Sequence, residues 1–199
     1  MIGAGYSNKT GYPSVTQVFR PWIDARWFTD EARDRGRAVH AAAAAHLQGL
    51  YVPPLPPGWA PYFDSFRAWA DLMLDDVIMV ERRLVDTVRG YCGQADLVCT
   101  LRGRAGAVLV DWKTSATPEK WWSLQVAAYR QLCSDGYLSE TSGRVTDNNP
   151  VGIETAAGAS VMLMADGSVA VAAFYGQHMR DFNVFMGALV AHQFFEGRK

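Results

Sequence analysis

The segment from Ala107 to Lys113, which reads AVLVDWK, constrains the fold of this chain more than any other. Its near-continuous apolar run is typical of a central strand that is covered on both faces. Asp111 and Lys113 stand at the C-terminal end of the run, and side chains two apart on a strand point to the same face. A lone charge buried there would be costly, so something must pair it. A structural ion pair is the simplest explanation, and a catalytic pair is the alternative.

Helices are predicted before this strand. Ser14-Val-Thr-Gln17 has the form of a capping box, which starts a short helix towards Arg20. Five consecutive alanines favour a longer helix, and Pro61 suits the first turn of a third one, with apolar residues at spacings of three and four after it. The two longer helices are expected over Asp30–Gln48, before Gly49, and from Pro61 to about Met73.

The hydrophobic period then changes from that of a helix to that of strands. Strands are predicted over Val77–Val88, Tyr91–Leu101 and Ala107–Trp112, followed by a helix from Pro118 to about Cys133, a hairpin of Val161–Met164 with Val169–Phe174, and a closing amphipathic helix over Met179–Glu196. Loops are expected at Val52–Trp59, where four prolines forbid regular structure, and at about Tyr137–Gly158. This order predicts one α/β domain with a helical N-terminal elaboration.

Composition limits the class of protein. The 199 residues are 49% apolar and 20% charged, as in a soluble globular domain. A net charge of -1 excludes a polybasic protein that holds nucleic acid by bulk charge, but not an enzyme whose carboxylates bind a metal. Three scattered cysteines without a CxxC argue against a disulfide framework, a zinc finger and an iron–sulfur cluster. With neither a signal-peptide pattern nor an apolar run of about 20 residues, we expect a cytoplasmic protein that does not contact a membrane.

Asp96, near the middle of the preceding predicted strand, adds to the argument for chemistry. Antiparallel neighbours can bring Asp96 beside Asp111, and two such carboxylates repel each other unless a cation lies between them. Oxygen ligands suit Mg²⁺ or Mn²⁺, and Lys113 could then orient water or stabilise charge on a phosphate. Glu81, one strand earlier, could add a third carboxylate; a solvated ion pair with Arg82 or Arg83 is the alternative.

Two helices supply further candidates. His40 lies on the alanine-rich helix and could contact a metal or a phosphate, although a lone helical histidine is more often a packing residue. Arg33, Arg35 and Arg37, with the small Gly36, suggest a place where the backbone meets phosphates. Gln125 and Tyr129 are four residues apart on the predicted fourth helix and share a face. They could point at a phosphate or base next to the metal, or they could simply lie on the helix surface.

The order of these motifs resembles the RecB-like branch of the PD-(D/E)xK nuclease superfamily, especially its small phage-encoded exonuclease-type members. The matching motifs are Gly36-x-x-x-His40, Glu81, Gly93-x-x-Asp96, Asp111-x-Lys113 and Gln125-x-x-x-Tyr129, preceded by Pro13-Ser-Val-Thr-Gln17. The resemblance spans roughly residues 13–190. It implies a single restriction-endonuclease-like domain over 1–199, in which a mixed central sheet is flanked by helices. Residues 13–60 would form the N-terminal helices, 61–136 the catalytic core, and 159–196 a hairpin with a closing helix.

The resemblance also implies roles for individual residues. His40, Asp96, Asp111 and the Trp112 carbonyl would bind Mg²⁺ or Mn²⁺, and Lys113 would be the catalytic lysine. Gln125 and Tyr129 would help to hold the DNA strand, and Glu81 stands where many relatives have an acidic residue. Neither an iron–sulfur cluster nor a nucleotide cofactor is expected.

The implied activity is metal-dependent hydrolysis of DNA, as an exonuclease rather than an endonuclease, in phage recombination, repair or end processing. DNA is then the partner, with a single-strand annealing or recombination protein as a second one, and the compartment is the host cytoplasm if a phage encodes the chain. The oligomeric state stays open. The competing hypothesis is a DNA-binding or assembly module that has the same fold but does not cleave. A three-strand segment with a purely structural Asp111–Lys113 pair is a third.

Overall fold

The computed structural model describes residues 11–23, 29–115, 117–140, 145–147 and 149–196. Its strands are β1 (Leu74–Asp86), β2 (Tyr91–Leu101), β3 (Ala107–Lys113), β4 (Tyr137–Leu138), β5 (Thr155–Met162) and β6 (Val171–Tyr175). They form one mixed sheet in the order β4-β1-β2-β3-β5-β6. β3 and β5 run parallel, and the other neighbouring strands pair antiparallel. The predicted α/β class and the mixed sheet flanked by helices are therefore confirmed.

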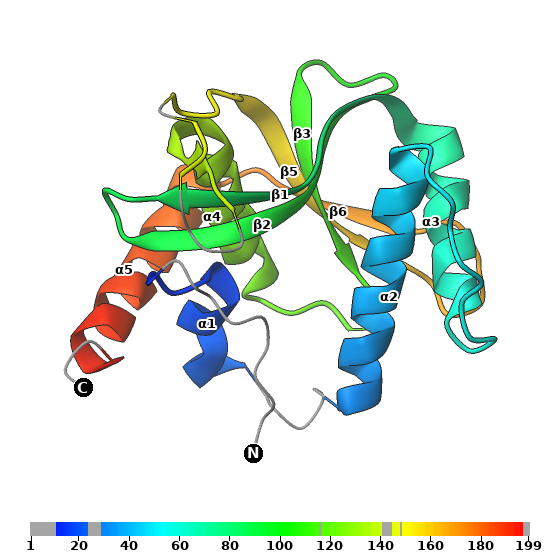
Figure 1. The fold of residues 1–199 in the computed structure, drawn as a ribbon, viewed down its shortest axis with the longest axis horizontal. Coiled ribbons are helices and arrows are strands. Elements are labelled where there is room, and N and C mark those ends of the chain that lie inside the picture. Colours follow the sequence, from blue (N-terminus) through cyan, green and yellow to red (C-terminus); the bar gives the residue numbers. More distant parts are fainter. Residues whose placement is uncertain (1–10, 24–28, 116, 141–144, 148, 197–199) are drawn as a thin grey trace.

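Helices cover both faces of this sheet (Figure 1). They are α1 (Val15–Phe19), α2 (Asp30–Leu47), α3 (Ala60–Met73), α4 (Trp122–Asp135) and α5 (His178–Glu196), with a short 3-10 turn η1 (Arg20–Trp22) after α1. One apolar core joins α1, α4 and α5 to the sheet, and a second joins α2 and α3 to its opposite face. β3 lies between β2 and β5 and contributes to both cores, which confirms it as a central strand.

The predicted capping box, the end of the alanine-rich helix and the proline-rich loop are confirmed. The capping box is formed, because Ser14 Oγ accepts from the Gln17 backbone N–H and the Gln17 side chain accepts from the Ser14 backbone N–H. α2 ends within a residue of its expected end, and Gly49 follows in the left-handed conformation that a residue without a Cβ adopts readily. The Val52–Trp59 segment contains neither a helix nor a strand.

Several predicted boundaries are wrong. α4 begins at Trp122 and not at Pro118, since the residues before Trp122 form bends and turns. β5 begins at Thr155, inside the predicted Tyr137–Gly158 loop, because pairing with β3 orders a segment whose small residues carry a weak strand pattern. That loop also contributes β4, which pairs with β1. Its residues 141–144 and 148 lie outside the part of the chain that the structure describes.

The closing helix is confirmed, but its predicted amphipathic character is wrong. α5 buries Phe182, Phe185 and Leu189 against the sheet side. Its other side exposes further apolar side chains, among them Val184 and Val190, where a polar face was expected.

Candidate metal centre

Three acidic residues lie in a row across three neighbouring strands. β1 and β2 pair in register on both sides of Glu81, which places Glu81 opposite Asp96. The pairing of β2 with β3 ends at Leu97 and Val110, one residue before Asp96 and Asp111. Continued by one residue, this antiparallel register places Asp96 opposite Asp111, as predicted.

The Asp96 carboxylate occupies the place where this ladder stops. Its Oδ2 accepts a hydrogen bond of 2.9 Å from the Trp112 backbone N–H, so a side chain continues the ladder in place of a backbone carbonyl. Its Oδ1 lies 3.2 Å from Nδ1 of His40. Asp96 is only 7% exposed, and these two contacts fix both of its oxygens within the buried edge of the site.

His40 reaches Asp96 from α2. The helix is held against the sheet by the neighbouring buried Val39 and Ala43, and its first turn is capped by the Thr29 side chain. Burial by itself lowers the pKa of His40, but the charge and hydrogen bond of Asp96, with smaller effects of Glu81 and Asp111, raise it to about 9. Without a metal ion, His40 is therefore a cation at neutral pH, and its proton balances part of the acidic charge.

Glu81 combines an unusual backbone with an unusual carboxyl group. Its φ of 49° lies in the left-handed region, which costs a non-glycine residue about 1–3 kcal/mol. Its carboxylate accepts a hydrogen bond from the Gln94 side-chain amide. Burial, followed by the charge of Asp96, raises the pKa of Glu81 to about 7, although His40 and Gln94 act in the opposite direction. A conformation that costs free energy and brings a carboxylate towards Asp96 suggests a functional constraint.

His40, Glu81 and Asp96 together offer a ligand set. One imidazole nitrogen and one oxygen from each carboxylate all lie within 4.8 Å of one another. The elevated pKa of Glu81 reflects crowded acidic groups, and a divalent cation would relieve that crowding. The two carboxylates suit Mg²⁺ or Mn²⁺, whereas an imidazole is a more usual ligand of transition metals. The residues present therefore fit a divalent cation.

Asp111 connects this cluster, through Lys113, to side chains on α4. Asp111 Oδ2 lies 2.5 Å from the ammonium of Lys113, so the two charges project together as predicted. That oxygen is buried without a hydrogen bond of standard geometry among the described residues. Burial raises the pKa of Asp111, and the positive charge of Lys113 opposes the rise.

Lys113 is held from the other side by Gln125 and Tyr129. Its ammonium donates to Gln125 Oε1 at 2.6 Å, and Gln125 Nε2 donates to the Tyr129 hydroxyl at 3.2 Å. Gln125 and Tyr129 share a helix face, as expected, but they are 5% and 7% exposed, so the interpretation as ordinary helix surface is wrong. The Lys113 ammonium also lies 5.2 Å and 5.3 Å from the ring centroids of Trp121 and Trp122. The lysine thus has a fixed position between Asp111 and α4.

The three predicted phosphate-binding arginines have protein partners. Arg33 pairs with Asp30 at 2.8 Å, and the nearest contact of Arg37 with Asp34 is 3.7 Å. Arg35 donates to the Thr114 carbonyl at 3.2 Å, and its guanidinium lies 4.8 Å from the Tyr62 ring centroid. Arg35 therefore ties α2 to the chain just after Lys113, while the other two lie along the helix surface.

Two contacts were not anticipated from the sequence. Gln94, which orients Glu81, lies inside the recognised Gly93-x-x-Asp96 motif, and it shares a strand face with Asp96 because the two are two residues apart. The Trp112 N–H donates to Asp96, and its indole packs edge-on against Phe66 and Trp69, while the role of its carbonyl as a metal ligand stays a prediction. Alternation along the strand could have indicated Gln94, but the sequence carries no signal for the N–H contact.

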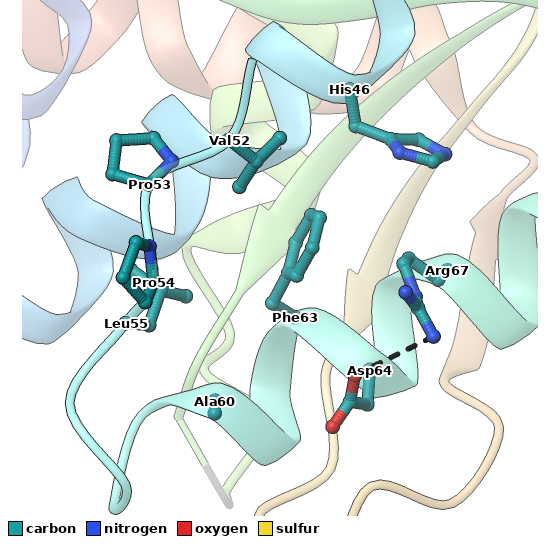
Figure 2. Close-up of a pocket in the computed structure, with 9 residues that line it drawn as sticks. All are labelled: His46, Val52, Pro53, Pro54, Leu55, Ala60, Phe63, Asp64 and Arg67. Carbon is teal, nitrogen blue, oxygen red and sulfur yellow. Dashed lines mark ion pairs between the residues drawn. The ribbon is translucent and has the colours of Figure 1, made fainter.

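A separate cavity of about 290 Å³ lies between α2, α3 and the proline-rich loop. Figure 2 shows its lining, with Phe63 between the loop and His46, and an ion pair of Asp64 with Arg67 at one side. None of the predicted site residues lines this cavity. Among the described residues, no helix is long and apolar enough to cross a membrane.

Comparison with known proteins adds no assignment. No protein-family model matches the chain, and no curated protein is similar enough to count as a relative.

Proposed function

We propose that the chain is a divalent-metal-dependent DNA nuclease with a restriction-endonuclease-like fold, similar to the RecB-like branch of the PD-(D/E)xK superfamily. The observation that carries the proposal is the cluster of His40, Glu81 and Asp96 directly beside the Asp111–Lys113 pair. A metal ligand set next to a fixed ammonium is a combination that can catalyse phosphodiester hydrolysis, because both can stabilise negative charge that develops on the phosphate.

The arrangement of the fold supports this proposal. The candidate residues come from a mixed sheet in which β1, β2 and β3 are antiparallel neighbours and α4 connects β3 to the parallel β5. The resemblance in the sequence implies such a sheet with flanking helices. The motif residues, spread over almost 90 positions between His40 and Tyr129, converge on one region of it.

His40, Glu81 and Asp96 would hold the ion, with Asp111 at its edge. When bound, a divalent ion would supply Lewis-acid chemistry, polarising the scissile phosphate and lowering the pKa of water. Lys113 would contribute a fixed positive charge where negative charge accumulates on the phosphate during hydrolysis. The partial burial of Lys113 strengthens this effect, because the lower local dielectric screens its charge less than water does.

Gln125 and Tyr129 would act through Lys113. Because both are buried, the structure favours a role in orienting the ammonium over direct contact with a DNA strand. DNA contacts would then come from exposed groups around the site, including Arg37.

Exonuclease action on DNA ends is the favoured form of the activity, on analogy with the family that the motifs resemble. The same analogy implies a role in phage recombination, repair or end processing. It also implies an annealing or recombination protein as partner and the cytoplasm as compartment.

The test uses end-labelled linear DNA and closed circular DNA of the same sequence. Wild-type protein, Asp111→Asn and Lys113→Ala are each incubated with Mg²⁺, Mn²⁺ or EDTA. We expect metal-dependent loss of linear DNA in the wild type alone, with the circle intact. Cutting of the circle would indicate an endonuclease.

Two results would contradict the proposal. If the wild type binds DNA but leaves every substrate intact in both metals, the alternative of a non-cleaving DNA-binding module is correct. If both substitutions leave the rate of cleavage unchanged, hydrolysis comes from a contaminant or from another site. Circular dichroism of both variants confirms that they are folded.

A further inference from the structure

α5 carries an apolar surface on the side that faces away from the molecule. Phe182, Phe185 and Leu189 point into the core, as expected for a helix that covers a sheet. A surface helix normally has a polar outer side. Here the outer side exposes large apolar residues instead: Met179 (61%), Val184 (51%), Val190 (60%), Phe194 (53%) and Phe195 (73%). From Phe182 to Phe195 the helix contains no Asp, Glu, Lys or Arg.

Gly187 is the midpoint of α5, which runs from His178 to Glu196. A glycine inside a helix is unfavourable relative to alanine because it increases the entropy lost on folding. Packing against the described residues does not explain it: apart from its two chain neighbours and the nearby helix backbone, none of their heavy atoms lies within 4 Å of the position that a Cβ would take. It lies on the same outer side as Val184 and Val190, where its small size allows a second helix to approach closely.

We propose that α5 is a dimerisation helix that pairs antiparallel with α5 of a second copy of this chain, about a two-fold axis at Gly187. Such an isologous contact requires a self-complementary surface. With Gly187 opposite itself, Val184 and Val190 flank the axis, so that each lies level with the partner's copy of the other. The apolar residues on each half of the helix therefore find apolar residues on the other copy.

The charges of α5 also fit an antiparallel pair. Arg180 lies seven residues before Gly187 on the outer side, so it faces the last turn of the partner helix. That turn is the negative end of the helix dipole, which attracts a guanidinium. A parallel pair would place the two Arg180 side chains together, and their like charges would repel.

The proposed contact goes beyond the nuclease function and does not depend on it. α5 and the α2 helix that carries His40 pack on opposite faces of the sheet. Pairing through α5 leaves the α2 face accessible to DNA. A 19-residue helix is about 28 Å long, so one helix per copy gives a contact at the lower end of specific interfaces. We therefore expect a weak association that depends on protein concentration.

The first test is cysteine cross-linking of the full chain. A disulfide needs two Cα atoms within about 7 Å, which a close two-fold contact at Gly187 provides. Gly187→Cys is compared with Leu72→Cys, an exposed helical position on α3; the three native cysteines are buried. We expect rapid oxidation of Gly187→Cys to a covalent dimer. If it cross-links no faster than Leu72→Cys, the proposal is wrong.

The second test is sedimentation equilibrium over protein concentrations from about 1 to 500 µM, which detects dissociation constants across the micromolar range. Val190→Glu is matched with Leu72→Glu, since the native side chains are 60% and 59% exposed. We expect Val190→Glu to weaken dimerisation by about tenfold or more, because it buries charge without a partner, and Leu72→Glu to have no effect. A wild type that is monomeric throughout, or a dimer that Val190→Glu leaves unchanged, would overturn the assignment.

Discussion

At the scale of single residues, a substitution of Gln125 tests whether this side chain holds the Lys113 ammonium in place for cleavage. Gln125→Leu keeps the approximate size of the side chain but removes the acceptor for the ammonium and the donor to Tyr129. We expect a roughly 10- to 100-fold slower cleavage step, because a displaced catalytic group is costly, and an unchanged DNA dissociation constant. Single-turnover kinetics and equilibrium binding measure the two quantities separately.

The matched control is Gln131→Leu, the same change on the same helix, where the native amide bonds to Asp135. It is expected to leave the cleavage step unchanged. A Gln125→Leu protein that binds DNA more weakly but cleaves bound DNA at the wild-type rate would instead assign Gln125 to DNA contact.

The protonation of His40 and Glu81 predicts how metal affinity depends on pH. With pKa values of about 9 and about 7, both groups must lose protons before they bind an ion. Apparent Mn²⁺ affinity should therefore rise from pH 6 to about pH 9, with net release of protons. Calorimetry in two buffers of different ionisation enthalpy measures the release. Affinity that does not change over this range would show that these residues are not the ligands.

The same pKa values predict the stability of the metal-free protein. Folding raises both pKa values above their ordinary values of 6.5 and 4.5. Each group therefore contributes fully to the stability of the fold at a pH below its ordinary pKa, and this contribution is lost as the pH rises to the pKa of the folded protein. In EDTA, these groups should lower the free energy of unfolding between pH 5 and pH 9. Glu81→Gln should reduce the fall, most clearly between pH 5 and pH 7, as measured by urea denaturation. Equal slopes for variant and wild type would contradict the assignment.

At the scale of elements, α4 packs on β2 at a glycine. A Cβ on Gly93 would lie 2.5 Å from Cε1 of Tyr129 and 3.1 Å from Cδ1 of Leu132. Gly93→Ala should therefore push α4 away from the sheet and destabilise the fold by about 1–3 kcal/mol, with slower cleavage because Tyr129 supports Gln125 and Lys113. Gly58→Ala is the control, since no heavy atom of the described residues, apart from the two chain neighbours, lies within 4 Å of a Cβ at that position. Denaturant midpoints measure the loss of stability, and single-turnover rates measure the slower cleavage. A Gly93→Ala protein with the same stability and cleavage rate as the control would refute the close packing.

Local patterns in the sequence predicted most elements, because they act within a few residues. The capping box at Ser14, the alanine run and the apolar β3 segment each specify an element directly. The start of β5 and the position of β4 depend instead on pairing with β3 and β1, which no local pattern contains. The same limit applies to the site: the spacing of Asp111 and Lys113 predicted their contact, whereas the left-handed backbone of Glu81 could not be predicted.

At the scale of the whole molecule, the net charge of -1 predicts DNA binding that depends on metal. Each bound divalent ion adds two positive charges at the site where acidic groups otherwise repel phosphate. We expect DNA affinity to rise on addition of Ca²⁺, used as a non-hydrolysing probe, and to fall with increasing salt. Fluorescence anisotropy measures both. Tight binding in EDTA that resists salt would contradict this account.

One measurement tests the central claim most directly: single-turnover cleavage of end-labelled linear DNA by wild type and Lys113→Ala, with Mn²⁺ and DNA binding measured on the same samples. The account predicts that both proteins bind the ion and the DNA, while the variant cleaves more than about 100-fold more slowly. Wild-type protein that binds Mn²⁺ and DNA but cleaves no faster than Lys113→Ala would contradict it.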